Sequence, residues 1–570
     1  MFDLVIRGGE VIDGTGAMRR RLDVGITGDR IVELGDLSGA DAKSVIDATG
    51  YVVTPGFIDV HTHLDAQAFW DPTLSPSPLH GVTSVVGGNC GFSIAPLGKN
   101  PADGAYLMNM LSRVEGMPLE SLETGVPWTW DTTEEYLALL DNTLAINAAF
   151  KVGHSAIRRV VMGADATKRE ATPDEIAAMC GLVRDAIEAG AIGFSSSWST
   201  THNDTEQRMV PSRYASREEL LALCAVLADY PGTSLEFIPQ VGIFTAESIE
   251  LMAEMSRVAN APLNWNVLMV GASNREEVEA KLAASDFADM NGGKVRALTA
   301  PMALNFRLCF QSGFLLDAIP GWEETMLLPK AEKLAAFRNP AEVARLEAAA
   351  QAADYLRAVT NWSKMFIHHT VHPDNAKYTG RNIGEIASER GQSPWAALVE
   401  IALLDELQTS FGPPGTEEPD ATWKARVEVW RDPRAVVGAS DAGAHLDLFL
   451  TANYTTTLLG EAVVKRQLLP LEEAINYLTA VPADLYGFVD RGRIKVGAFA
   501  DLVVLDEHNV GSNETTFKSD LPAGGTRLYA DARGIKSVIC NGQEIVCEGE
   551  FTAARPGSIL RTGVHTTANM

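Results

Sequence analysis

Eight short apolar segments recur along the middle of this chain, and each is followed by small or polar residues. They alternate with stretches of helical character, such as residues 174–189 and 216–228. Strands that alternate with helices are typical of βα units around a parallel sheet. The candidate strands end near His63, Cys90, His154, Ser197, Gln240, Leu268, Met302 and Asp441. Since eight βα units close a (β/α)8 barrel, the sequence predicts an α/β chain with a TIM-type barrel.

The two ends of the chain differ from the middle in their pattern of strands and turns. Residues 1–54 contain short strand-like segments separated by glycine-rich turns, and similar segments return after residue 485, with Asn541-Gly542 as a hairpin signal. These features predict a small β-sandwich built from residues 1–54 and 485–570, with the barrel over residues 55–484. Residues 305–433 are too many for a βα connection. We expect them to form a helical subdomain inserted before the last barrel strand, and one interpretation is a lid.

Two histidines spaced by one residue follow the first barrel strand. Side chains at positions i and i+2 of a strand point to the same side, so His61 and His63 can bind one metal ion together. In (β/α)8 barrels the chemistry lies at the carboxyl ends of the strands, where this pair is placed. Two unrelated surface or core histidines are the alternative interpretation of the motif.

Cys90 and Asp441 follow the second and the eighth candidate strands. With the histidines they supply imidazole, thiolate and carboxylate, which are the groups that zinc accepts. The alternatives are a buried core thiol for Cys90 and a helix cap or turn residue for Asp441. We expect His61, His63, Cys90 and Asp441 to hold a divalent metal, zinc in the first instance, with one tightly bound ion favoured over two.

Several longer motifs lie in a fixed order along the chain. They read GGEVIDGTG, VVTPGFIDVHTH, GVTSVVGGNCGFSIAPL, GHSAIRRVVMG, GASDAGAH and LTAVPADLYGFVDRGRIKVGAFADLVVLD, followed by DLPAGGTRLYADARGIKSVICNGQEI. Their order resembles that of the amidohydrolase superfamily, and most of all its N-acyl-D-amino-acid deacylase (D-aminoacylase) branch. The resemblance spans nearly the whole chain and implies a metal-bearing barrel with a small β-sandwich. It also implies that Asp441 takes a proton from metal-bound water and passes it to the leaving amine.

The chain departs from this branch at the second metal position. Deacylases of the branch carry a histidine after the fifth strand and another after the sixth, whereas residues 234–240 read SLEFIPQ and residues 262–268 read PLNWNVL. A lysine that other superfamily members carry on the fourth strand is also absent from residues 191–197. Lys151 lies one strand earlier, and either a metal-bridging lysine or, preferably, a partly exposed lysine near a strand end is expected there.

A second departure concerns the substrate. The lysine of a His-His-Lys element is missing around Trp265, and residues 442–451 contain no arginine. A free amino-acid carboxylate would therefore lack its usual partner. A less polar amide, a lactam or an ester stays open as a substrate beside an N-acyl amino acid.

Further polar residues at strand ends are candidates for substrate contacts or for support of the metal ligands. Glu236, Gln240, Asn264 and Asn266 offer oxygen atoms. For His154, a place in the site and a structural role inside the barrel are equally compatible with the sequence. Two further candidates are histidines. His445 could orient Asp441 or cap the following helix. His369 of the inserted segment could be a replacement metal ligand or a substrate contact, although a surface histidine is the favoured interpretation.

The formal charge of −27 argues against nucleic acid or an anionic membrane as the main partner, because both attract basic surfaces. The first residues lack the pattern of a signal peptide, no uncharged apolar run approaches membrane-spanning length, and the six cysteines show no disulfide-framework spacing. A cytoplasmic protein that acts on a small molecule is expected. The sequence leaves open whether it forms a homo-oligomer.

Two functions from different classes follow. The favoured one is a metal-dependent hydrolase that cleaves a C–N bond of a linear amide, with metal-bound water as the nucleophile and Asp441 as general base and acid. The other is a barrel that has lost catalysis and serves as a binding protein, an idea motivated by the two missing histidines. A placed Asp441 favours the enzyme.

Overall fold

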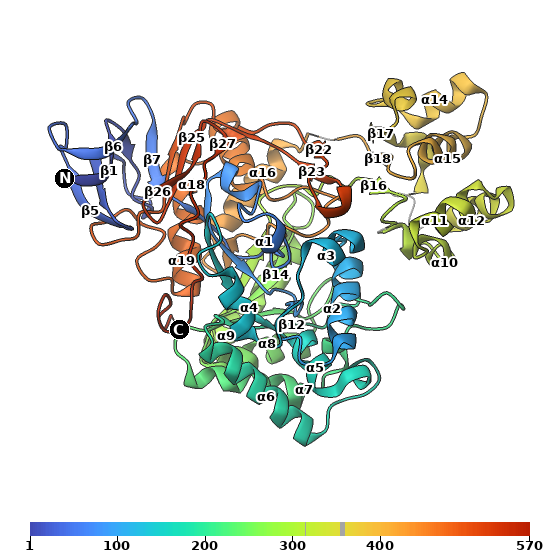
Figure 1. The fold of residues 1–570 in the computed structure, drawn as a ribbon, viewed down its shortest axis with the longest axis horizontal. Helices are drawn as coiled ribbons and strands as arrows, with labels where there is room; N and C mark the ends of the chain where they lie inside the picture. Colours follow the sequence, from blue (N-terminus) through green and yellow to red (C-terminus); the bar gives the residue numbers. More distant parts are fainter. Residues whose placement is uncertain (314, 354–359, 416, 570) are drawn as a thin grey trace.

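The middle of the chain closes into a parallel barrel (Figure 1). The computed structural model describes residues 1–313, 315–353, 360–415 and 417–569. Neighbouring barrel strands pair in parallel, and Thr62 pairs with Ala442, which joins the eighth strand to the first. The strands are β8 (Phe57–Asp59), β9 (Val82–Gly87), β10 (Asn147–Phe150) continued by β11 (Val152–Gly153), β12 (Gly193–Ser197), β13 (Ser234–Ile238), β14 (Leu263–Leu268), β15 (Val295–Thr299) and β19 (Ala435–Val437). The predicted (β/α)8 fold is confirmed.

The sequence explains why these segments are strands and why helices follow them. All residues of β8 and β9 are buried, as expected of parallel strands covered on both faces. Thr132 and Thr172 each begin a helix with a reciprocal capping box. The helices around the barrel are α1 (Gln67–Trp70), α2 (Pro101–Val114), α3 (Leu119–Gly125), α4 (Thr133–Leu140), α5 (His154–Met162), α6 (Pro173–Glu188), α7 (Arg217–Ala225), α8 (Ala246–Ala259), α9 (Arg275–Met290), α16 (Asp420–Trp430), α17 (Tyr454–Leu458), α18 (Leu471–Leu478) and α19 (Ala480–Tyr486).

Strands from both chain ends form two facing sheets beside the barrel. β7 (Val52–Pro55) pairs antiparallel with β20 (Leu502–Leu505), so the second sheet mixes the two ends of the chain. The first sheet contains β1 (Phe2–Arg7), β4 (Asp23–Thr27), β5 (Arg30–Gly35) and β6 (Ala42–Asp47). The second adds β2 (Glu10–Val11), β3 (Arg20–Arg21), β25 (Ile535–Cys540), β26 (Gln543–Cys547) and β27 (Glu550–Phe551). An apolar cluster that includes Ile6, Ile26, Val53 and Val504 draws residues from both sheets.

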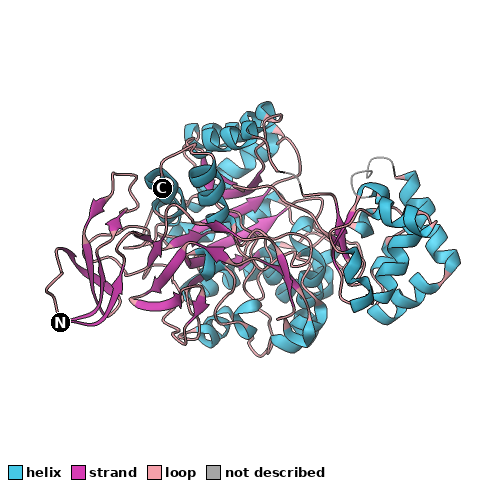
Figure 2. Ribbon diagram, turned by 90° about the horizontal axis from the view of Figure 1, so that it is seen from above, coloured by secondary structure: helices cyan, strands magenta, loops and turns pink. Residues whose placement is uncertain are grey.

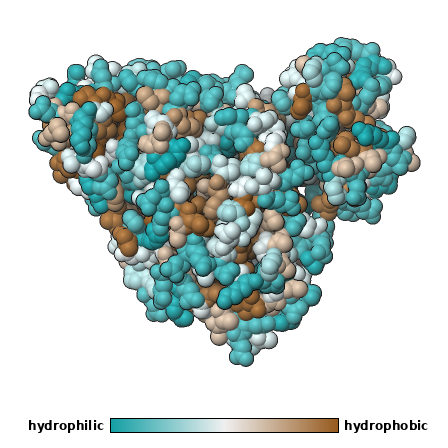
Figure 3. Space-filling model, in the orientation of Figure 1, coloured by the Kyte–Doolittle hydropathy of each residue, from teal (hydrophilic) through white to brown (hydrophobic). Residues whose placement is uncertain are grey.

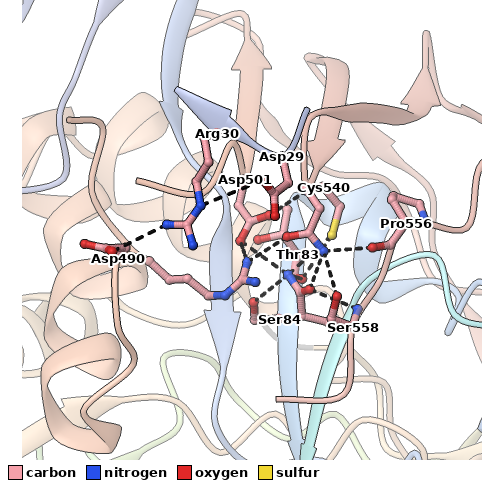
Figure 4. A network of polar contacts seen from close by, with 12 residues as sticks. Asp29, Arg30, Thr83, Ser84, Asp490, Asp501, Cys540, Pro556 and Ser558 are labelled. Atoms are coloured by element: carbon pink, nitrogen blue, oxygen red, sulfur yellow. Dashed lines mark hydrogen bonds and ion pairs between the residues drawn. The ribbon is translucent and has the colours of Figure 1, made fainter. Parts of the chain in front are cut away.

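A buried polar network joins this sandwich to the barrel (Figure 4). The carboxylate of Asp501 accepts hydrogen bonds from the backbone N–H of Asn541 at 2.8 Å, from Asn147 Nδ2 at 3.3 Å and from Arg491 Nη1. Asn147 lies in barrel strand β10, whereas Asp501 and Asn541 lie beside the sandwich strands β20 and β25. The contacts of Asp501 with Asn147 and Asn541 therefore connect the sandwich to the amino ends of the barrel strands.

The last residues run beneath the barrel instead of staying in the sandwich. Ala148 of β10 pairs in parallel with Ile559, and its backbone N–H donates to Ser558 O at 3.1 Å. Thr562 Oγ1 donates to Ala191 O at 2.8 Å. Residues 556–569 thus cover the amino ends of the strands, so the range 485–570 contains more than sandwich. Two short ladders precede them, β21 (Gly511–Ser512) with β24 (Ala532–Arg533) and β22 (Thr516–Lys518) with β23 (Arg527–Tyr529).

The segment between β15 and β19 forms a lobe that stands to one side of the barrel (Figures 1, 2 and 3). It contains a small sheet of β16 (Leu308–Cys309), β18 (Ser410–Gly412) and β17 (Phe366–His369), and the helices α10 (Glu323–Met326), α11 (Lys330–Arg338), α12 (Pro340–Ala352), α14 (Ile383–Arg390) and α15 (Pro394–Leu404). Its base meets the barrel where the backbone N–H of Arg307 donates to Leu448 O at 2.6 Å.

The helix α16 belongs to the barrel and not to this lobe. Its residues Trp423, Val427 and Trp430 are buried in the largest apolar cluster, with Val437 of β19. The helical insert therefore ends before residue 420, earlier than the predicted limit of 433. The pattern of apolar residues in a helix does not reveal whether the helix packs against the barrel or against the inserted lobe. Among the described residues, no helix is long and apolar enough to cross a membrane.

Candidate metal centre

The first and eighth barrel strands bring three of the predicted ligands together. The backbone N–H of His63 donates to Ala442 O at 2.7 Å, and the backbone N–H of Asp441 donates to His61 O at 3.1 Å. The side chains of both histidines are almost fully buried, whereas 32% of the Asp441 side chain is exposed. The two histidines therefore lie at the buried bottom of the site, and Asp441 lies against them on the side nearer the solvent.

Four donor atoms converge at this point. Asp441 Oδ1 lies 3.2 Å from His61 Nε2 and 3.3 Å from His63 Nε2. Cys90 Sγ lies 3.5 Å from His61 Nε2 and 3.8 Å from His63 Nε2. The ligand atoms of His61, His63 and Cys90 all lie within 4.8 Å of one another. Two imidazole nitrogens, a thiol and a carboxylate are a donor set that fits zinc.

The backbone that carries Cys90 and Asp441 is held in a conformation that is unfavourable for side chains with a Cβ. Their φ angles are +56° and +57°. Such angles are uncommon for residues other than glycine, and they are retained where the surroundings fix them. In the same loop Gly88 has φ +70°, and a Cβ there would lie 2.1 Å from Lys151 O. The loop after β9 therefore requires glycine at position 88 to bring Cys90 to the histidines.

Glu236 and Asn266 lie against the same centre. Glu236 Oε2 accepts a hydrogen bond from the backbone N–H of Cys90 at 2.6 Å. Asn266 Nδ2 lies 3.4 Å from His61 Nε2 and 3.9 Å from Cys90 Sγ. Glu236 Oε1 and Asn266 Oδ1 are buried and find no hydrogen-bond donor among the described residues. Buried oxygen atoms of this kind are normally satisfied, and a cation or its water would satisfy them here.

Glu115 supports the centre but has no signal in the sequence. It follows α2, is 3% exposed, and its Oε1 lies 3.5 Å from His63 Nδ1. Burial raises the pKa of Glu115 to about 7, although His63 opposes this effect. A carboxylate on the second nitrogen of a ligand histidine fixes the tautomer and the ring orientation. Only the folding of the long segment after β9 brings Glu115 to His63.

The charges of the centre stabilise an ionised Asp441. Burial by itself would raise the pKa of Asp441, but hydrogen bonds from His61 and His63 outweigh burial and hold this pKa well below its usual range. Burial by itself would lower the pKa of His63, but the carboxylates of Glu115 and Asp441 raise it to about 9. Both directions follow from the same contacts between opposite charges.

Three other predicted residues lie outside the centre. Of the two roles left open for His154, its contacts favour the structural one, because α5 begins at this residue and its Nε2 lies 2.9 Å from Glu219 Oε1. Gln240 Nε2 donates to Ile243 O at 2.6 Å within its own loop. The ring of His369 stacks on Phe517 with centroids 4.3 Å apart. None of the three touches the cluster of metal-ligand atoms among the described contacts.

Two further residues lie nearer, in supporting positions. The backbone N–H of His445 donates to Glu115 O at 2.5 Å, and burial lowers the pKa of its ring to about 4. Lys151 was expected to be partly exposed, and this expectation is wrong, because it is 2% exposed. Its Nζ donates to Asn89 Oδ1 at 2.8 Å and to Tyr486 OH at 3.1 Å, while Asn264 Oδ1 accepts from Tyr486 OH at 2.8 Å.

Comparison with known proteins shows which family this chain resembles. The model of the amidohydrolase family matches residues 44–546. A D-aminoacylase of Alcaligenes xylosoxydans xylosoxydans is 30% identical over 574 residues, which cover 98% of this chain and 97% of the relative. An N-acyl-D-glutamate deacylase from Bordetella bronchiseptica, solved with zinc and a phosphonate inhibitor, superimposes with a TM-score of 0.65 at 27% identity and covers 98% of this chain and 100% of its own. A D-aminoacylase studied for the role of its binuclear metal centre gives a TM-score of 0.64 at 28% identity, with the same coverage.

The D-aminoacylase relative matches over almost its full length. The family model covers the whole barrel and the part of the sandwich that lies within residues 44–546. The motifs that suggested the resemblance also carry the converging donor atoms, on the carboxyl ends of β8, β9 and β19. Sequence, fold and site thus lead to one conclusion. The chain belongs to the amidohydrolase family.

Proposed function

We propose that the protein is a metal-dependent hydrolase that cleaves the amide C–N bond of an N-acyl amino acid. The observation that carries this proposal is the convergence of His61 Nε2, His63 Nε2, Cys90 Sγ and Asp441 Oδ1 at one point of the barrel mouth. The relatives named D-aminoacylase and N-acyl-D-glutamate deacylase support the same reaction.

These four residues would hold one divalent ion, with zinc as the first candidate. The structure of a relative with zinc supports the choice of metal. Glu236 and Asn266 occupy the strands where the resembling branch has its second-metal histidines, and this difference supports one tightly bound ion over two. An ion bound there would act as a Lewis acid towards the amide carbonyl and the attacking water.

Asp441 would move the proton. Its carboxylate is ionised, because His61 and His63 hold its pKa well below the usual range. It is also the most exposed of the four residues, so a substrate can reach it. A carboxylate in this position can take a proton from the attacking water and deliver it to the departing nitrogen.

The test is to purify the protein, measure bound metals by mass spectrometry, and assay a panel of N-acetyl-D- and L-amino acids, simple amides, lactams and esters for product release. We expect close to one zinc ion per chain and hydrolysis of N-acyl amino acids. Asp441→Asn should lower kcat by at least ~10²–10⁴-fold while the circular dichroism spectrum stays unchanged. Metal-loaded Asp441→Asn with near-normal turnover would remove Asp441 from the mechanism.

The alternative of a binding protein without catalysis predicts a different result. Wild-type protein loaded with metal would then bind members of the panel and hydrolyse none. A lactam or an ester as the preferred member would keep the hydrolase and change its substrate. The small-molecule substrate is part of this proposal, whereas cytoplasmic location and a homo-oligomer remain predictions.

A further inference from the structure

An ion pair joins the inserted lobe to the barrel helix α2. Arg113 lies in the last turn of this helix, and its Nη2 lies 2.6 Å from Asp317 Oδ2 of the lobe. The two side chains are 16% and 4% exposed. The backbone N–H of Asp317 donates to Gly313 O at 3.0 Å, and the preceding Leu316 is buried in the apolar cluster of the lobe. Asp317 is therefore fixed to the lobe, and Arg113 to the barrel.

Glu115 follows the same helix directly, so its position depends on the contacts that hold the chain after α2. Its backbone N–H donates to Leu111 O at 2.9 Å, and its own O accepts from the backbone N–H of His445 at 2.5 Å. Its carboxylate lies 3.5 Å from His63 Nδ1. The next residue, Gly116, has φ +60°, and a Cβ there would lie 3.4 Å from His445 Cα. The end of α2 therefore fits closely against the loop that carries His445.

That loop, which begins with Asp441, also reaches the lobe. Leu448 and Phe449 are buried in the apolar cluster of the lobe. The ring centroids of Phe449 and His445 lie 5.0 Å apart. The lobe thus contacts both of the segments that bring carboxylates to the metal centre, the end of α2 with Glu115 and the loop with Asp441.

The burial of the ion pair makes this connection firm. Burial raises the pKa of Asp317, and Arg113 is the strongest of the groups that oppose burial. Removing one partner of a buried ion pair leaves an uncompensated charge. Without Asp317, the guanidinium of Arg113 would turn towards water, and the last turn of α2 would move with it. Glu115, two residues further along the chain, would then leave its place beside His63.

We propose that Arg113 is a positioning residue, whose ion pair with Asp317 uses the lobe to hold Glu115 against His63 and thereby sets the affinity of the metal centre. The inference rests on the metal centre of the proposed function and extends it to the lobe. A carboxylate on the second nitrogen of a ligand histidine fixes the orientation of the ring, and its loss weakens metal binding. A substitution that displaces Glu115 should weaken metal binding for the same reason.

The test is the zinc affinity of the full-length protein, measured by competition with a chromophoric chelator after zinc has been removed and returned. Asp317→Asn and Arg113→Met should each weaken zinc binding ~2–30-fold, the range for residues that act through a packed network. Arg113→Lys should keep part of the affinity, because lysine retains the charge but not the planar guanidinium. The double variant Arg113→Met with Asp317→Asn leaves no uncompensated charge, and should show the same weakening in a more stable fold.

Asp103→Asn is the matched control. Asp103 lies in the first turn of the same helix and pairs with Arg159 at 2.7 Å, with side chains 4% and 10% exposed. Its loss should lower the midpoint of urea unfolding about as much as the loss of Asp317, but it should leave zinc affinity unchanged, because this pair lies at the other end of α2. Equal zinc affinities of Asp103→Asn and Asp317→Asn, whether both unchanged or both weakened, would overturn the inference.

The Glu115→Gln background shows whether the ion pair acts through Glu115. There Asp317→Asn should have little further effect on zinc affinity, because the carboxylate that it displaces is already gone. A full effect in this background would overturn the inference.

The proposed function can fail separately. Wild type that binds zinc tightly and hydrolyses no member of the substrate panel would overturn the hydrolase and leave the role of Arg113 standing, provided that Asp317→Asn weakens zinc binding. Hydrolysis by the wild type, together with wild-type zinc affinity in Asp317→Asn, would overturn the role of Arg113 alone. Wild type that binds no zinc would overturn both.

Discussion

Replacing Asp501 by asparagine should be among the most destabilising conservative changes in this protein. The side chain of Arg491 is 1% exposed, and its carboxylate partner, Asp501, is 5% exposed. Asp501 also accepts from Asn147 Nδ2 and from the backbone N–H of Asn541. Asparagine keeps the shape but removes the charge, and its NH2 group then faces donors instead of accepting from them.

The magnitude follows from the burial of the pair. Removing one partner of a buried ion pair leaves an uncompensated charge and costs about 3–5 kcal/mol. An exposed pair contributes only about 0–1 kcal/mol. The total stability of a folded domain is about 5–15 kcal/mol, so the loss would be a large fraction of it. Arg491 also stacks on the Phe499 ring at 3.8 Å, which recovers little of the lost charge interaction.

The assay is urea unfolding followed by circular dichroism and by tryptophan fluorescence. Asp501→Asn should move the first unfolding transition to clearly lower urea. Asp484→Asn is the matched control, because Asp484 pairs with Arg493 at 2.7 Å with side chains 63% and 34% exposed. The double variant Arg491→Met with Asp501→Asn should be more stable than Asp501→Asn alone. An Asp501→Asn midpoint equal to that of Asp484→Asn would refute the reasoning.

Three further outcomes test the site and the pH response. The double variant His61→Ala, His63→Ala should lose bound metal, and unchanged metal content would remove both residues from the centre; Cys90→Ser asks separately whether sulfur contributes. Glu115→Gln should weaken metal affinity ~10–100-fold in competition with a chelator, as loss of a histidine-orienting carboxylate does elsewhere, and full affinity would assign Glu115 a purely structural role. Burial lowers the pKa of His80 to about 4 from an ordinary 6.5, so the unfolded chain binds more protons between these values and stability falls as pH drops. His80 alone should contribute a loss of about 2 kcal/mol between pH 8 and pH 5, and the check is that the loss in urea unfolding is smaller by about this amount in His80→Gln than in wild type.

The parts of the fold that could be predicted are those governed by local sequence. All eight barrel strands end close to the predicted positions, because each buried parallel strand is a short apolar run with its own boundary. The ligands at positions 61, 63, 90 and 441 lie next to those boundaries, so predicting the strands also predicted the cluster.

The parts that escaped prediction depend on distant packing. Glu115 comes from the long connection after β9, and no local spacing relates it to the histidines. His154 was ambiguous because a strand and a helix meet at that residue, and the helix directs its ring to Glu219. Lys151 is buried because Asn89 and Tyr486 satisfy its ammonium group, and these partners lie 62 and 335 positions away in the sequence.

The pairing of β7 with β20 has a consequence for the synthesis of this chain. The two strands are separated by about 450 residues, and at ~5–20 residues per second the ribosome needs roughly 20–90 s to make the second after the first. During this interval β7 presents an unpaired edge, and the apolar face that Ile6 and Ile26 share with Val504 has no cover. Until the strands after residue 500 are made, this apolar surface stays uncovered and is open to pairing with other chains.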